Sequence, residues 1–272
     1  MASEIRQIQL KCLELLFVVD NICRRNGIQY SLCGGSVVGA HLYGGCLPWD
    51  DDIDLMMTRE NYDRFNEIAP RELPPELSIH NFNLTEDFTT PFTKIMNDRT
   101  TIVQQDNVIS GVFLDITVYD RIPLNKLSEI DKFLWKISQI IMIGKVKPSS
   151  LKDKMRNFML STFLSNRRAF LLRFQKIARF LGKTPNYCYS ELFGAFANTV
   201  GYDAHIFENY IDIDFEGGRF MIVRDYVDYL TTRYNRTDFH EPKEKQVAPH
   251  YQYVNFELPY REYLRCIQAY EQ

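Results

Sequence analysis

The stretch Pro48-Trp49-Asp50-Asp51-Asp52-Ile53-Asp54 constrains the fold and the chemistry of this chain more than any other. It holds four carboxylates in five positions, and each raises the pKa of its neighbours unless a cation lies between them. A divalent metal ion is the cation that we expect. The residues that follow, Leu55-Met56-Met57, favour a β-strand. In a strand that includes both aspartates, Asp52 and Asp54 would point to the same face and converge on one point.

The sequence upstream supplies a second half for such a site. Gly34-Gly35-Ser36 precedes the acidic run at a distance that one short helix could span. Two adjacent glycines let the backbone approach a ligand closely, and Ser36 could cap the next helix, whose N-terminal amides favour an anion. Hard oxygen ligands beside this turn suit Mg²⁺ or Mn²⁺ together with a substrate phosphate. The alternative is a solvated acidic turn without a ligand, and both the glycines and the strand-forming continuation argue against it.

Gly35-Ser36-Val37-Val38-Gly39-Ala40, followed by Gly44-Gly45-Cys46-Leu47 and the acidic run, resembles the signature of the LicD family, which includes fukutin and fukutin-related protein. Family members have a nucleotidyltransferase fold similar to that of DNA polymerase beta. They transfer a phosphorylated alcohol from a CDP-linked donor to a glycan. The resemblance covers roughly residues 5–125 and 205–250. It implies an α/β (α+β) fold in which helices flank a mixed sheet.

The resemblance also implies roles for individual residues. Asp115 falls where the fold has its third carboxylate, so the implied catalytic residues and metal ligands are Asp52, Asp54 and Asp115. In that role Asp115 could also accept the proton of an attacking hydroxyl. A positive side chain, Lys94 or Arg99, could neutralise charge in the transition state. The residues expected to bind substrate are Gly34, Gly35, Ser36, Trp49, Asp50, Lys94, Arg99 and His250.

Two positions depart from the family pattern. Ser36 replaces the usual threonine and keeps its hydroxyl group. Leu42 stands where the family has an arginine, so this chain lacks a permanent cation that could pair with phosphate or with acidic residues. The departure at Leu42 leaves the donor headgroup or its binding mode open, although the carboxylate set is intact.

The function expected from the resemblance is metal-dependent transfer of phosphocholine from CDP-choline to a hydroxyl of a cell-surface glycan precursor, either free or lipid-linked, with release of CMP. Mg²⁺ or Mn²⁺ is the expected cofactor. Ribitol phosphate and glycerol phosphate are alternative headgroups. Two other classes stay open: a nucleotidyltransferase that uses the same metal set, and a non-catalytic glycan-assembly binding protein. The intact Asp52, Asp54 and Asp115 argue against the non-catalytic class.

Composition is typical of a cytoplasmic enzyme. The chain has 272 residues, 45% of them hydrophobic, enough for one large domain or one domain with an insertion. No apolar run approaches the roughly 20 residues that span a bilayer, and the N-terminal segment lacks the core of a signal peptide. The six cysteines follow no zinc-binding spacing and are expected to be reduced thiols.

Residues 132–183 differ from the rest of the chain in charge. They contain thirteen Lys and Arg and one acidic residue, Asp153, which gives +12 in a chain of net charge −3. We expect residues 127–200 to form a basic helical insertion between a catalytic core at 1–126 and a closing segment at 201–272. The apolar residues among these cations leave two interpretations. The segment makes peripheral contact with the inner face of an anionic membrane or with a lipid-diphosphate acceptor, or it folds as a self-packed subdomain. No nucleic-acid recognition motif is present.

Hydrophobic periodicity predicts the order of the elements. A helix begins after Ser3 and ends at Gly27, and its role is packing without chemistry. A short helix should follow the Gly-Gly-Ser turn, and a further helix around residues 59–69 should stop at Pro70. Strands are expected near residues 28–33, 53–57, 92–96, 100–104 and 112–118.

Overall fold

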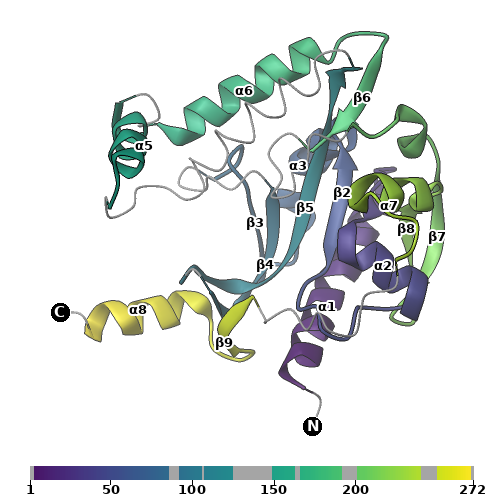
Figure 1. Ribbon diagram of the computed structural model, residues 1–272. Helices are drawn as coiled ribbons and strands as arrows, with labels where there is room; N and C mark the ends of the chain where they lie inside the picture. The colour runs from purple at the N-terminus through teal and green to yellow at the C-terminus, as the bar shows by residue number, and fades with distance from the viewer. Residues whose placement is uncertain are drawn as a thin grey trace.

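The computed structural model describes residues 3–85, 92–105, 107–124, 149–162, 166–191, 201–239 and 250–270. Helices flank a mixed seven-stranded sheet (Figure 1). The predicted α/β class is therefore confirmed. The elements are α1 Glu4–Arg25, β1 Ser31–Leu32, α2 Gly34–Tyr43, β2 Asp54–Thr58, α3 Arg59–Glu72, β3 Leu77–His80, β4 Thr93–Gln104, β5 Ile109–Pro123, α5 Leu151–Thr162, α6 Arg167–Leu181, β6 Tyr187–Ser190, the 3₁₀ helix η2 Ala204–Phe207, β7 Tyr210–Phe215, β8 Gly218–Val223, α7 Tyr226–Tyr234, β9 Tyr251–Asn255 and α8 Tyr260–Tyr270.

The sheet joins segments that are far apart in the sequence. Its strand order is β1-β2-β5-β4-β3, with β6 paired to β5 and β9 paired to β4. β2 and β5 are parallel, and the other pairs in this sheet are antiparallel. β7 and β8 form a separate hairpin. Because β2 lies beside β5, residues near position 54 come next to residues near position 115.

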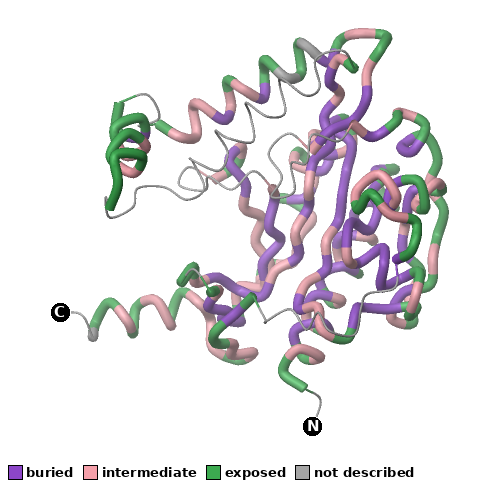
Figure 2. Tube along the Cα trace, in the orientation of Figure 1, coloured by how far each residue is buried: buried purple, intermediate pink, exposed green. Residues whose placement is uncertain are grey.

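Helix α1 forms where the sequence predicts it. The Ser3 hydroxyl accepts a hydrogen bond from the Arg6 amide at 3.2 Å, and Gly27 follows the helix with φ of +59°. A glycine has no steric penalty in this left-handed conformation. The buried face of the helix, which includes Leu15 and Leu16, joins one hydrophobic core with the inner strands. Of these strands, β2 is almost entirely buried (Figure 2).

The prediction that Pro70 stops the helix around residues 59–69 is wrong. Pro70 lies inside the last turn of α3, which continues to Glu72. The helix ends because Pro74 follows Leu73, and a residue that precedes proline is disfavoured in the helical region. Leu73 accordingly has an extended ψ of 138°.

The strands also differ from their predicted limits. The two strands expected near residues 92–96 and 100–104 are one strand, β4, with a register shift between Asn97 and Ile102. At this irregularity a side chain at Gly111 would collide with the Asn97 carbonyl, so the close strand approach needs glycine there. β1 is shorter than expected, and β2 begins at Asp54 instead of near Asp52.

The basic segment is helical in its described part. α6 runs across the end of β5 at which β6 pairs (Figure 1). Arg168 donates hydrogen bonds to the carbonyls of Phe82 at 2.7 Å and Asn83 at 3.0 Å, which joins the segment to the loop after β3. Residues 132–148, with four of the counted cations, lie outside the described residues. Contact with an anionic membrane stays a prediction. In the described part of the chain, no helix is both long enough and apolar enough to cross a bilayer.

Candidate active site

The sheet aligns three of the predicted site residues in one row. Asp54, the first residue of β2, is the register partner of Asp115 in β5. Asp115 is in turn the partner of Lys94 in β4. Side chains of directly paired residues lie on the same face of a sheet. Three residues from distant parts of the sequence therefore meet on one face.

Lys94 and Asp115 form an ion pair within this row. The Lys94 Nζ lies 3.0 and 3.2 Å from the two carboxylate oxygens of Asp115. Burial raises the pKa of Asp115, and the neighbouring ammonium of Lys94 opposes that rise. Lys94 is itself buried, so the attraction between the two side chains is weakly screened by solvent.

The remaining carboxylates raise one another's pKa. Burial, followed by the negative charge of Asp115, raises the pKa of Asp54 to about 7. The pKa of Asp52 is raised well above its usual value by burial and then by the charges of Asp54 and Asp50. Burial also raises the pKa of Asp50. Asp52 lies just before β2 and not inside a strand as predicted, yet it remains electrostatically coupled to Asp54.

A second contact joins the acidic run to the C-terminal part of the chain. Asp51 is buried and accepts hydrogen bonds from the backbone amide and from Nδ1 of His250, each at 2.8 Å. The hydrogen bond to Asp51 raises the pKa of His250. Within the described ranges, Asp51, Asp52 and His250 form a group whose potential ligand atoms all lie within 4.8 Å of one another. Asp51 was not singled out from the sequence, although it belongs to the acidic run.

The glycine turn lies directly against the carboxylates. α2 begins at Gly34, which has φ of +52°, and its N-cap is Cys33. The prediction that Ser36 caps this helix is therefore wrong, because the helix begins two residues earlier. Ser36 Oγ instead accepts a hydrogen bond from the backbone amide of Asp54 at 3.0 Å. A Cβ on Gly35 would come 2.6 Å from the Asp50 Oδ2, so this close approach requires glycine.

Two predicted substrate-binding residues lie at the margin of this arrangement. Trp49 is half-buried and packs edge-on against Tyr43, with ring centroids 6.3 Å apart. Arg99 is exposed on β4, beyond Asn97, which is already three register pairs from the Lys94–Asp115 pair. The structure therefore does not bring Arg99 into the row of Asp54, Asp115 and Lys94.

A buried arginine that sequence reasoning missed lies beside the turn. Arg233 of α7 has a side chain only 9% exposed and donates hydrogen bonds to Glu191 at 3.2 Å and to the Tyr119 hydroxyl at 3.3 Å. A Cβ on Gly34 would lie 3.5 Å from its Nε. Its positive charge opposes the rise in the Asp54 pKa. Leu42, at the position of the family's arginine, packs against the hydrophobic core instead.

Helix α1 also does more than the predicted packing. The Gln9 side chain is buried, and its Nε2 donates hydrogen bonds to the carbonyls of Leu47 at 2.9 Å and Asp50 at 2.7 Å. It therefore holds the backbone that leads into the acidic run. The sequence contained a signal for this contact, because Gln9 is a polar residue on the apolar face that includes Ile8 and Cys12.

The hairpin turn at Glu216 supports the same loop from the other side. Glu216 Oε1 accepts a hydrogen bond from the Cys46 amide at 2.9 Å, and Glu216 pairs with Arg6 of α1 at 2.6 Å. A Cβ on Gly45 would come 2.6 Å from Oε1 of Glu216. The loop before the acidic run is thus fixed by α1 and by the β7–β8 turn together.

Comparison with known proteins identifies the family of this chain. Residues 27–126 match the family model described as LicD/FKTN/FKRP, nucleotidyltransferase domain. The chain is 31% identical over 262 residues to the lipopolysaccharide cholinephosphotransferase LicD of Haemophilus influenzae (strain ATCC 51907 / DSM 11121 / KW20 / Rd), across 91% of this chain and 96% of that protein. The similarity to LicD extends over nearly the whole of both chains, and the range matched by the family model spans the positions of Asp54, Asp115 and Lys94. The chain belongs to the LicD family.

Proposed function

We propose that this protein transfers phosphocholine from CDP-choline to a hydroxyl group of a glycan and releases CMP. The observation that carries the proposal is the row of Asp54, Asp115 and Lys94 beside the turn Gly34-Gly35-Ser36, because it combines carboxylates, a cation and a glycine turn in one place. The choice of phosphocholine rests on the relative, which is named a cholinephosphotransferase and is 31% identical to this chain.

Asp52, Asp54 and Asp115 would hold Mg²⁺ or Mn²⁺. Their chemistry fits these ions, which prefer oxygen ligands and commonly bind substrate phosphates as well. Burial raises the pKa of all three carboxyl groups, and neighbouring negative charges raise the pKa of Asp52 and of Asp54 further. A bound cation relieves that repulsion. When bound, the ion supplies charge neutralisation for the diphosphate of the donor. The neighbouring Asp51 and His250 hold each other and fix the backbone beside Asp52.

The residues of the chain then have distinct tasks. The first turn of α2, which includes Gly35, orients the donor phosphate, since the N-terminal amides of a helix favour anions. The acceptor oxygen forms a bond to the phosphorus that carries choline, and the bond from that phosphorus to the oxygen of CMP breaks. The proton of the acceptor hydroxyl passes to Asp115. Lys94 lowers the pKa of Asp115 and so favours the ionised carboxylate that accepts this proton.

Product analysis tests the proposal. The purified protein is incubated with Mg²⁺, a glycan acceptor and, in separate reactions, CDP-choline, CDP-ribitol or CDP-glycerol. The expected result is CMP together with a phosphocholine-modified acceptor, and Asp54→Asn should abolish both products. Transfer of CMP to the acceptor with release of phosphocholine would identify nucleotidyl transfer, and no turnover with any donor would favour a binding protein; either result would overturn the proposal.

Binding of the donor gives an independent measurement. A ligand that binds the native state raises the melting temperature. CDP-choline with Mg²⁺ should raise the melting temperature more than Mg²⁺ alone. Stabilisation by a purine nucleotide, without any by the three CDP-alcohols, would contradict the proposed donor.

A further inference from the structure

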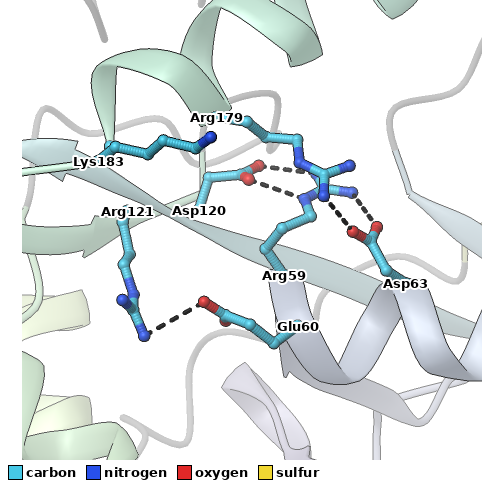
Figure 3. A pocket seen from close by; sticks show the side chains of 8 residues that line it. Arg59, Glu60, Asp63, Asp120, Arg121, Arg179 and Lys183 are labelled. Atoms are coloured by element: carbon cyan, nitrogen blue, oxygen red, sulfur yellow. Dashed lines mark hydrogen bonds and ion pairs between the residues drawn. The ribbon is translucent and has the colours of Figure 1, made fainter.

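A charged pocket lies where α3, β5 and α6 meet (Figure 3). Its volume is about 200 Å³. A water molecule occupies about 30 Å³ in the liquid, so the pocket has room for a small anionic group with some water. The pocket is lined by Arg59, Glu60, Asp63, Asp120, Arg121, Arg179, Gly182 and Lys183.

The deepest part of the pocket is a preformed ion pair. Arg59 donates two hydrogen bonds of 2.7 Å from Nε and Nη2 to the two oxygens of Asp120, and both side chains are almost fully buried. This bidentate geometry fixes the guanidinium group in one orientation. The Arg59 Nη1 lies 3.4 Å from Asp63, which connects the pair to the rim.

The rim carries two further arginines that neighbouring groups hold in place. Arg179 of α6 pairs with Asp63 at 2.8 Å, and its side chain is 50% exposed. Arg121 pairs with Glu60 at 3.2 Å and lies over the ring of Tyr187, with its guanidinium carbon 4.6 Å from the ring centroid. A guanidinium group has five N–H donors, so each of these two arginines keeps donors beyond the one that its carboxylate accepts.

Lys183 gives the pocket an uncompensated positive charge. Four cations and three carboxylates line it, which gives a net charge of +1. The three carboxylates are all engaged by the three arginines, whereas no ion pair of Lys183 is found in the part of the chain that the structure describes. In Figure 3 the Lys183 side chain extends from the end of α6 toward Asp120 and Arg179. An anion bound there would therefore meet an ammonium group and two accessible guanidinium groups.

This pocket is separate from the row of Asp54, Asp115 and Lys94. Asp115 and Asp120 lie five residues apart on β5, where the register with β2 is regular from Asp54 to Thr58. An odd separation places their side chains on opposite faces of the sheet, and five residues of a parallel strand span about 16 Å. A group bound in the pocket is thus distinct from the donor phosphate that would bind beside Asp54 and Asp115.

We propose that the pocket binds a phosphate group, as a phosphate monoester or a diphosphate, that is distinct from the diphosphate of the nucleotide donor. Phosphate suits this pocket because its several oxygens can accept from guanidinium forks and from an ammonium group at once. Arg179 and Lys183 belong to the basic segment, so the bound phosphate would bridge that segment and the sheet. The inference stands on the pocket itself and does not depend on the proposed transfer reaction.

Calorimetric titration with pyrophosphate and with glycerol phosphate tests the site. The full chain is used with excess chelator and without donor, at constant ionic strength, so that neither metal nor transfer activity enters the measurement. Lys183→Glu and Arg179→Gln should each weaken pyrophosphate binding by about tenfold or more, because hydrogen bonds to charged groups contribute about as much free energy as a tenfold change in affinity. Acetate should bind more weakly than either phosphate compound.

Lys176→Gln is the matched control. Lys176 is an exposed residue of the same helix as Arg179 and does not line the pocket, and its replacement removes one positive charge, as Arg179→Gln does. This variant should bind pyrophosphate as the wild type does. The proposal is overturned if wild type binds neither phosphate compound at low salt, if Lys183→Glu binds like wild type, or if Lys176→Gln loses as much affinity as Arg179→Gln.

Vesicles distinguish the sources of the phosphate. Sedimentation with vesicles of neutral lipid and of neutral lipid mixed with phosphatidic acid, a phosphate monoester, compares a lipid headgroup with a soluble ester. If a lipid headgroup is the ligand, wild type and Lys176→Gln should sediment with the anionic vesicles and Lys183→Glu should not. If the ligand is soluble, glycerol phosphate should bind in the titration while the Lys183→Glu change leaves sedimentation unaltered. A phosphate site is supported in both cases.

Discussion

The hydroxyl oxygen of Ser36 accepts a hydrogen bond from the backbone amide of Asp54 at 3.0 Å. The amide of Cys33 also donates to the carbonyl of Asp54, at 2.8 Å. These two bonds join the start of α2 to the first residue of β2. The glycine turn and the carboxylate row are consequently one structural unit, and a change in either is transmitted to the other.

Ser36→Ala should therefore reduce both stability and activity. The substitution leaves the buried amide of Asp54 without its acceptor, which costs about 1–3 kcal/mol in the free energy of unfolding. We also expect kcat to fall, because Asp54 loses the bond that fixes its position. Ser36→Thr is the control, since it keeps the hydroxyl group. Chemical denaturation and steady-state kinetics check the two effects, and full activity in Ser36→Ala would contradict the link between turn and carboxylate.

The sequence predicted the local features of this unit better than its long-range contacts. The pattern around Asp54 indicated a strand, and the resemblance pointed to Asp115, which proved to be the register partner of Asp54. Periodicity did not show that Ser36 lies inside the helix and contacts a strand residue eighteen positions later. Strand limits depend on pairing partners, so a single segment could not reveal that β4 continues through its irregularity.

The contacts of Gln9 and Arg233 were harder to predict for the same reason. Both residues lie on helices, and their partners are loops or turns far away in the sequence. Gln9 gave a local signal as a polar residue on an apolar face, whereas Arg233 could be read as one more cation at a helix end. Only the packing of α7 against α2 brings Arg233 next to Gly34.

Because Lys94 and Asp115 form an ion pair, we expect substitutions of these two residues to have coupled effects on the free energy of unfolding. Lys94→Met leaves a buried carboxylate without its cation, and Asp115→Asn leaves a buried ammonium, so each should lower the free energy of unfolding by up to a few kcal/mol. The double variant should lose less than the sum of the two, because no buried charge is left unpaired. A double-mutant cycle from denaturation curves measures this coupling, and simple additivity would show that the ion pair contributes no coupling energy.

The same pair predicts a shift in the pH dependence of activity. Lys94 lowers the pKa of Asp115, so its loss in Lys94→Met raises that pKa. If the ionised Asp115 accepts the proton, the acid limb of the kcat/KM profile should move to higher pH in this variant. An unshifted acid limb would argue that another group accepts the proton.

The raised pKa of Asp54 predicts how the stability of the metal-free protein depends on pH. Its pKa in the folded protein is about 7, above the usual value of 3.8, so between these values the folded state binds more protons than the unfolded state. The stability contributed by protonated Asp54 is present at low pH and is lost as the pH rises through about 7. The melting temperature in chelator should accordingly fall less between pH 5 and 8 in Asp54→Asn than in wild type. Equal slopes would show that Asp54 does not titrate in this range.

We expect the Gln9→Leu substitution to reduce function while helix α1 stays folded. Leucine suits a helix and the apolar face of α1, but it cannot donate to the carbonyls of Leu47 and Asp50. Leaving these carbonyls without donors should free the loop that carries the acidic run, and we expect the affinity for Mg²⁺ to fall by about tenfold, since roughly 1.4 kcal/mol of lost positioning has that effect. Asn21→Leu, on an exposed position of the same helix, is the matched control. Calorimetric titration with Mg²⁺ and circular dichroism separate the two contributions. If Gln9→Leu keeps the wild-type metal affinity, the contacts of Gln9 stabilise the fold without positioning the carboxylates.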